Sequence, residues 1–153
     1  MSIQNTPLPF PELDLHLLRR PEMAEDGRAV ELRGRQLPAL RIPANALGGL
    51  AMDFDTLQAR LAELPRMFLE LDGSFMWAGS HLTNDWRIDG MIFENARTVR
   101  WVEIKGQCPL SAWDQLLMHL GHDMDPLVAL WLPEQCFLEV EQVRSFWNEV
   151  RAS

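Results

Sequence analysis

The spacing of apolar residues predicts a helix followed by a β-hairpin in the middle of the chain. Leucines recur every three or four positions in DTLQARLAEL, residues 55–64, where Asp55 is placed to cap a helix and Pro65 to end it. Residues 66–79 carry two apolar stretches on either side of an Asp-Gly pair, which suits a type I′ turn. The chain is therefore expected to pass from this helix into an antiparallel sheet.

Two longer strands are predicted directly after the hairpin. Residues 86–94 and 98–106 both alternate apolar with polar side chains, and a short polar loop separates them. Together with the hairpin they predict a four-stranded antiparallel meander. The glycine at position 90 also fits a bulge or bend within the first of these two strands.

Two helices and another strand are predicted in the last third of the chain. Residues 109–121 begin with proline and end with glycine, which is the usual punctuation of a helix. Residues 126–133 form a continuous apolar run typical of a buried strand, and residues 139–150 have the apolar spacing of an amphipathic helix. The order of helix, strands, helix, strand and helix predicts an α+β fold with an antiparallel meander and flanking helices.

The first third of the chain has a different character. Its prolines predict an extended lead-in, and residues 28–34 and 36–43 predict two short strands, the second interrupted by Pro38. We expect residues 1–54 to be an N-terminal extension, with short strands or a short helix, packed on a core of residues 55–153. The whole chain is expected to form a single domain.

Composition narrows the classes of protein that fit this chain. A mass of 17.6 kDa with 47% apolar residues suffices for one core and not for two domains. The net charge of -8 disfavours a broad nucleic-acid surface, although a metal ion or a few arginines could hold a polyanion locally. Cys108 and Cys136 are too few for a disulfide framework, which favours a reducing, cytoplasmic setting. No apolar run reaches the ~18 residues of a membrane helix, so no membrane partner is expected.

Lys105 is the only lysine among 14 basic residues, which makes its position a candidate for special chemistry. The alternation puts Lys105 and Glu103 on one face of their strand, and Asp89 on the matching face of the strand before. If a three-residue loop joins the two strands, Asp89 lies directly opposite Glu103. Facing carboxylates repel each other, so a divalent cation or Lys105 itself is expected between them.

An aspartate on one strand and Glu-x-Lys on the next resembles the PD-(D/E)XK nuclease superfamily, although Ile88 stands at its name-giving proline position. The resemblance covers most of the predicted core and implies an αβββαβ-like layout with an extra strand and a C-terminal helix. It implies that Asp89 and Glu103 bind magnesium, which prefers hard oxygen ligands, with the carbonyl of Ile104 as a further ligand. It also implies that Lys105 is the catalytic lysine, a role that arginine would not fill freely.

Four other residues are candidates for accessory roles. Glu63 is the counterpart of an acid that the first helix of the family often supplies, and Gln115 lies in the helix after the lysine, where some members carry a glutamine. Arg87 shares the predicted face of Asp89 and could contact phosphate. Trp101 shares the face of the Glu-x-Lys pair, where it could line a pocket or a partner surface.

Two functions from different classes follow from these residues. The first is a magnesium-dependent nuclease, or a protein derived from one, that hydrolyses phosphodiesters. The second is a non-catalytic, acidic binding module that uses its sheet face to contact a protein partner. For Glu103 and Lys105, the ordinary alternative is an ion pair that faces solvent. The segment HLGHDMD, residues 119–125, is interpreted as a loop at a helix end rather than as a metal site.

Overall fold

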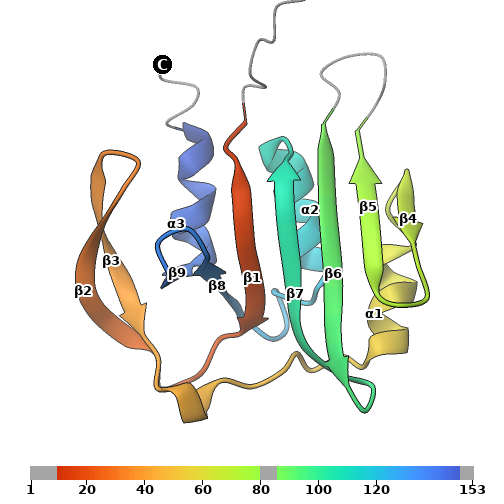
Figure 1. Ribbon diagram of the computed structural model, residues 1–153, viewed down its shortest axis with the longest axis horizontal. Helices are drawn as coiled ribbons and strands as arrows, with labels where there is room; N and C mark the ends of the chain where they lie inside the picture. The colour runs from red at the N-terminus through yellow and green to blue at the C-terminus, as the bar shows by residue number, and fades with distance from the viewer. Residues whose placement is uncertain (1–9, 80–85, 149–153) are drawn as a thin grey trace, which may run out of the picture.

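Within residues 10–79 and 86–148, which the computed structural model describes, nine antiparallel strands form one open sheet with three α-helices on a single face (Figure 1). The predicted α+β class with an antiparallel sheet is therefore confirmed. The strands are β1 (Leu13–Arg19), β2 (Glu25–Leu32), β3 (Arg35–Arg41), β4 (Met67–Leu69), β5 (Ser74–Ala78), β6 (Arg87–Asn95), β7 (Thr98–Gln107), β8 (Leu127–Trp131) and β9 (Cys136–Glu139). The helices are α1 (Phe54–Leu61), α2 (Leu110–His119) and α3 (Val140–Arg144), with a 3₁₀ helix, η1, at Ala44–Ala46.

The first strand lies in the middle of the sheet. The strand order is β2-β3-β9-β8-β1-β7-β6-β5-β4, and the predicted meander is confirmed as β4 to β7. In β1, Leu15 pairs with Ile104 of β7 on one side and with Trp131 of β8 on the other. The expectation that residues 1–54 pack as an extension on a core of residues 55–153 has to be corrected, because β1 joins two parts of that core.

Strict alternation explains why this segment forms a central strand. Leu13, Leu15 and Leu17 have at most 2% of their surface exposed and belong to the main core, on the side that the helices cover. Asp14 and His16 alternate with them and therefore lie on the opposite face. The same alternation is visible in the sequence, directly after the prolines that predict an extended lead-in.

Most of the other predicted elements are confirmed, with differences at their ends. Strands β2 and β3 lie where two short strands were expected, and α2 and β8 correspond to the helix over 109–121 and the strand over 126–133. Strand β9 was not anticipated. The predicted helix over 139–150 begins with α3, and its last two residues lie outside the described part of the chain.

A two-residue turn and a bulge set the register between β6 and β7. Ala96 and Arg97 have φ angles of 52° and 70°, the left-handed conformation that a type I′ turn needs at both central positions. Next to the turn Asn95 pairs with Thr98, so the numbers of two paired residues add up to an odd value. If this pairing continued, the apolar residues of β6 and β7 would lie on opposite faces of the sheet. One extra residue in β7 restores the alignment before Phe93 pairs with Trp101.

The bulge places the candidate residues in a register different from the predicted one. Asp89 lies opposite Lys105, and Glu103 lies opposite Met91. The prediction of Asp89 opposite Glu103 across a three-residue loop is therefore wrong by two positions. The predicted faces were correct, because a shift of two positions preserves the alternation.

The first helix begins two residues earlier than predicted. Its N-cap is Asp53, whose side chain accepts a hydrogen bond of 2.8 Å from the backbone N–H of Thr56. Phe54, Leu57 and Leu61 of α1 are buried in the main core. The assignment of Asp55 as the cap was wrong because Phe54, three residues before Leu57, already belongs to the apolar face of the helix.

The glycine of β6 does not mark a bulge. Gly90 pairs regularly with Phe75 of β5 and with Ile104 of β7. A Cβ atom at Gly90 would lie 2.0 Å from Cζ of Phe75, whose side chain is only 4% exposed. The glycine therefore makes room for the Phe75 ring in the core.

Candidate functional site on the open face of the sheet

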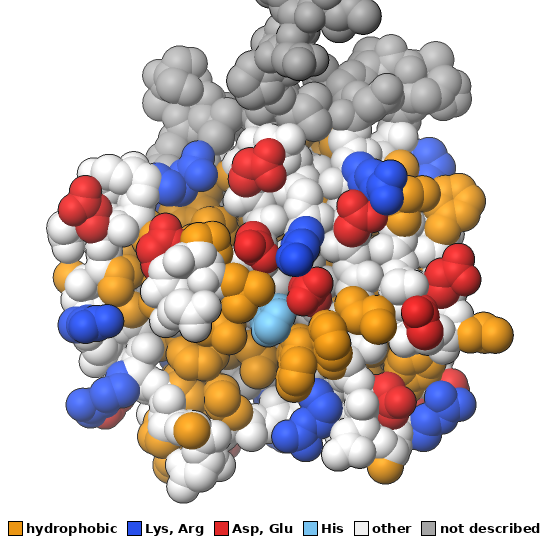
Figure 2. Space-filling view, viewed as in Figure 1, with side chains coloured by type: hydrophobic (Ala, Val, Ile, Leu, Met, Phe, Trp, Pro, Cys, Tyr) orange, Lys and Arg blue, Asp and Glu red, His pale blue; other side chains and the backbone are white. Residues whose placement is uncertain are grey.

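The sheet face that carries no helix, called the open face from here on, holds the candidate residues (Figure 1). Cross-strand partners share a face, so the register assigns side chains from β1, β6 and β7 to it. They are Asp14, His16, Leu18, Asp89, Met91, Phe93, Trp101, Glu103 and Lys105. Figure 2 shows acidic and basic side chains next to one another at the centre of this face, beside a histidine and a band of hydrophobic side chains.

Lys105 lies in a row of charged side chains that crosses three strands. Its neighbours in the row are Asp14 of β1 and Asp89 of β6. Its Nζ atom is 3.9 Å from Oε1 of Glu103, and 57% of the Lys105 side chain is exposed. The ammonium group of lysine is compact and sits on a flexible stem, so it can form an ion pair with any of several neighbouring carboxylates. This accounts for a lysine at this position without a catalytic role.

Glu103 is held from its other side by a histidine. Nε2 of His16 lies 3.3 Å from Oε2 of Glu103, and the ring nitrogen donates because a carboxylate can only accept. The side chains of His16 and Glu103 are 19% and 25% exposed, so both are well packed for a surface pair. The two oxygens of Glu103 thus face two different nitrogen groups of the protein.

Three rings form an aromatic stack beside these charges. Trp101 stacks on Phe93, with ring centroids 4.9 Å apart and an angle of 24° between the planes. The imidazole of His16 stacks on Trp101 at 5.6 Å and 22°, and it also lies 6.3 Å from the ring of Phe93 at 46°, so all three rings contact one another. The bulge in β7 makes this possible, because it brings Trp101 directly opposite Phe93. Nε1 of Trp101 is buried without a hydrogen-bond partner in the described part of the chain.

The carboxylate of Asp89 forms an ion pair with an arginine of its own strand. Arg87 donates from Nη2 to Oδ1 at 2.8 Å and from Nε to Oδ2 at 3.1 Å, a two-pronged contact. This hydrogen bonding, together with the charge of Asp89, raises the pKa of Arg87. More than half of each side chain is exposed, so the pair adds little to stability.

The donor set does not fit the magnesium site that the resemblance implies. Asp89 and Glu103 do lie on one face, as predicted, but they are not opposite each other. The carboxylate of Asp89 is engaged by Arg87, and that of Glu103 by His16 and Lys105. Among the described residues, no group of three or more His, Cys, Asp or Glu side chains is arranged to hold a metal ion.

The remaining candidates lie apart from the open face. Gln115 is in α2 and Glu63 follows α1, and both of these helices bury their apolar side chains against the opposite face. Nδ1 of His122 accepts a hydrogen bond of 2.9 Å from the backbone N–H of Leu127, which fits a loop role for HLGHDMD. His16 and Asp14 were not among the predicted site residues, and their signal in the sequence is the alternation in residues 13–19.

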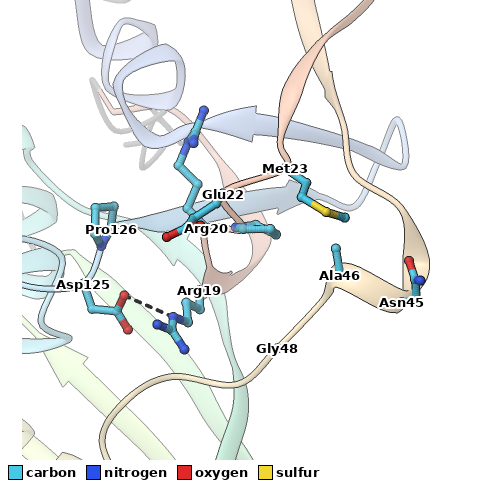
Figure 3. Close-up of a pocket in the computed structure, with 10 residues that line it drawn as sticks. Arg19, Arg20, Glu22, Met23, Asn45, Ala46, Gly48, Asp125 and Pro126 are labelled. Atoms are coloured by element: carbon cyan, nitrogen blue, oxygen red, sulfur yellow. Dashed lines mark hydrogen bonds and ion pairs between the residues drawn. The ribbon is translucent and has the colours of Figure 1, made fainter.

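A cavity of about 590 Å³ lies at the end of β1, away from the aromatic stack (Figure 3). Arg19 points toward Asp125 in it, with Nε 3.2 Å from Oδ1. Arg20 contacts both carboxylate oxygens of Glu139, at 2.7 and 3.0 Å, and the hydrogen bond raises the pKa of Arg20. Because each of these two arginines already faces a carboxylate, neither offers an unbalanced positive charge to a ligand.

Comparison with known proteins adds no relative from which a site could be transferred. None of the described helices is both long and apolar enough to cross a membrane. A scan against protein-family models gives no match, and searches of curated proteins and of solved structures give no significant match.

Proposed function

We propose that this chain is a non-catalytic binding module whose open face contacts a basic protein partner. The observation that carries the proposal is the stack of His16, Trp101 and Phe93 on a sheet face without helices. Aromatic side chains with one polar edge are the commonest anchors of protein interfaces. Such a stack, with charged residues beside it, supports recognition of another protein surface.

The stack is organised before any partner arrives. Trp101 contacts both of the other rings, and the contact with Glu103 holds His16 in place. Binding would therefore order few side chains, which lowers the entropic cost of association. This supports an interface centred on Trp101.

Charge determines the class of partner that we propose. The open face carries Asp14, Asp89 and Glu103 close to the stack, against Lys105 and the paired Arg87. The chain as a whole has a net charge of -8. A basic surface with an apolar centre complements these features and would be steered toward them.

A magnesium-dependent nuclease with an αβββαβ-like core is the second candidate. One observation favours it: Asp89, Glu103 and Lys105 share a face, with Lys105 next to both carboxylates. Its weakness is that protein cations already engage both carboxylates, so a metal ion would first have to displace them. The binding module requires no such rearrangement.

Photo-crosslinking from a single position tests the proposed interface. A benzophenone amino acid replaces Met91, next to the stack, in one protein and Met118 in a control. Met118 belongs to α2, on the other side of the sheet, and is 58% exposed. The proteins are incubated in a lysate of the organism that encodes the chain, and adducts are identified by mass spectrometry.

The expected result is a basic protein that crosslinks only from position 91. After purification, this protein should bind the unmodified chain, bind less at high salt, and bind at least about tenfold more weakly to Trp101→Ala. Adducts formed equally from both positions, or an acidic partner, would contradict the proposal. In parallel, a rise in melting temperature with magnesium that Asp89→Asn and Glu103→Gln abolish would favour the nuclease instead.

A further inference from the structure

The two edges of the sheet are protected to different degrees. Edge strand β2 carries four charged side chains in eight residues, and its pairing with β3 is interrupted by a bulge. Both features discourage another strand from pairing there. Edge strand β4 has the sequence Met-Phe-Leu, and Phe68 is 59% exposed. Leu71, just beyond it, is 95% exposed. Large exposed apolar side chains at an open edge mark a contact surface.

The hydrogen bonds of β4 show which backbone groups face outward. The N–H of Glu70 donates to the carbonyl of Ser74 at 2.9 Å, and the carbonyl of Arg66 accepts from Ala78 at 3.3 Å. Residues 66, 68 and 70 therefore direct their backbone groups toward β5. Because the direction alternates along an antiparallel strand, Met67 and Leu69 direct theirs toward the free edge.

We infer that a second copy of this chain pairs with β4, antiparallel and about a two-fold axis at Phe68. In this register Met67 lies opposite Leu69 of the second copy, and the two copies exchange four backbone hydrogen bonds. Phe68 then lies opposite its own counterpart in a non-hydrogen-bonded pair, the type in which side chains come closest. This contact is isologous, so each copy supplies the same surface.

The charges at the two ends of β4 favour a second copy over an unrelated strand. The sequence Arg-Met-Phe-Leu-Glu, residues 66–70, places a cation before three apolar residues and an anion after them. About an axis at Phe68, Arg66 of one copy faces Glu70 of the other, twice. Within the described residues neither side chain has a partner of opposite charge: Arg66 donates to the backbone carbonyl of Ala78 at 3.1 Å, and both residues are exposed. The edge is thus complementary to itself.

A dimer through β4 goes beyond the proposed function and does not depend on it. Phe68 pairs with Met76, which pairs with Asp89, so Phe68 lies on the open face. A dimer through β4 would therefore place two open faces side by side. The dimer is expected whether or not either face binds a partner.

Exchange of the two charges tests the register directly. Sedimentation equilibrium of the full-length protein, from micromolar to near-millimolar concentration, should show a reversible monomer–dimer equilibrium. Arg66→Glu alone and Glu70→Arg alone should each raise the dissociation constant about tenfold, because each puts like charges opposite each other at two places. An equimolar mixture of the two variants should dimerise as the unaltered chain does, because every pair in the mixed dimer is again of opposite sign.

A second comparison separates the edge from general hydrophobicity. Phe68→Glu places two carboxylates on the axis and should abolish the dimer, whereas Met118→Glu should leave it intact. The two side chains are equally exposed, at 59% and 58%. Circular dichroism of each variant verifies the fold. A wild-type chain that remains monomeric overturns the inference, as does a mixture of charge variants that fails to recover. A dimer that survives Phe68→Glu, or a foreign strand bound at β4 in its place, also overturns it.

Discussion

Gly90 and Phe75 illustrate how one residue without a side chain supports the core. A glycine in a strand normally weakens it, since it adds backbone freedom to the unfolded chain. Here the absence of a Cβ atom at Gly90 leaves space for the Phe75 ring. A Cβ atom at this position would lie 2.0 Å from Cζ of Phe75.

At this scale we predict that Gly90→Ala is destabilising despite its small size. Overpacking against a buried ring should lower the free energy of unfolding by about 1–3 kcal/mol, measured by urea denaturation. Gly48→Ala is the matched control, since nothing lies within 4 Å of a Cβ there, and it should be close to neutral. Adding Phe75→Leu to Gly90→Ala should recover part of the loss. If Gly90→Ala is as stable as the control, the ring does not need the space.

At the scale of one element, the cap of α1 makes stability depend on pH. The hydrogen bonds that Asp53 accepts from Thr56 hold the pKa of its carboxyl below the ordinary 3.8. A depressed pKa in the folded state means that the stabilisation is present above the unfolded pKa. It is lost as the pH falls through the lower folded value.

Asp53→Ala should therefore lower the melting temperature at pH 7 by about 3 °C, with a difference that shrinks as the pH falls below the ordinary carboxyl pKa of 3.8. Asp53→Asn keeps an acceptor oxygen and should lose less. Asp55→Ala is the control, because Asp55 does not cap the helix and its exposed ion pair with Arg97 is worth little. An equal loss from Asp55→Ala would show that the cap has been assigned to the wrong residue.

Elements and faces could be predicted from the sequence, and their relative registers could not. Alternation and helical spacing are local signals, so β6, β7 and α2 were found, and Asp89 was assigned to the face of Glu103. The register between β6 and β7 depends on a single extra residue in β7, for which the local pattern has no marker. His16 completes the site through pairing with a strand almost ninety residues away, which only the topology reveals. The magnesium and nuclease assignments remain predictions from a resemblance.

At the scale of the whole molecule, the position of β1 determines what can fold alone. A fragment of residues 55–153 lacks the strand between β7 and β8, and with it three buried leucines of the core. We predict that this fragment does not form a cooperative fold, which circular dichroism and amide hydrogen exchange would show. Addition of a peptide of residues 10–54 should restore cooperative melting. A fragment that melts cooperatively by itself would mean that β1 is an accessory strand.

The same strand has a consequence for how the protein is made. The ribosome completes β1 first, yet both of its neighbours, β7 and β8, emerge only after most of the chain has been synthesised. Until then three leucines and two open strand edges have no partner, which is the state in which nascent chains aggregate or recruit chaperones. Closing a sheet around its earliest strand also gives a high contact order, and hence slow folding for a domain of this size. The synthesis of β1 and the completion of the sheet around it are therefore far apart in time.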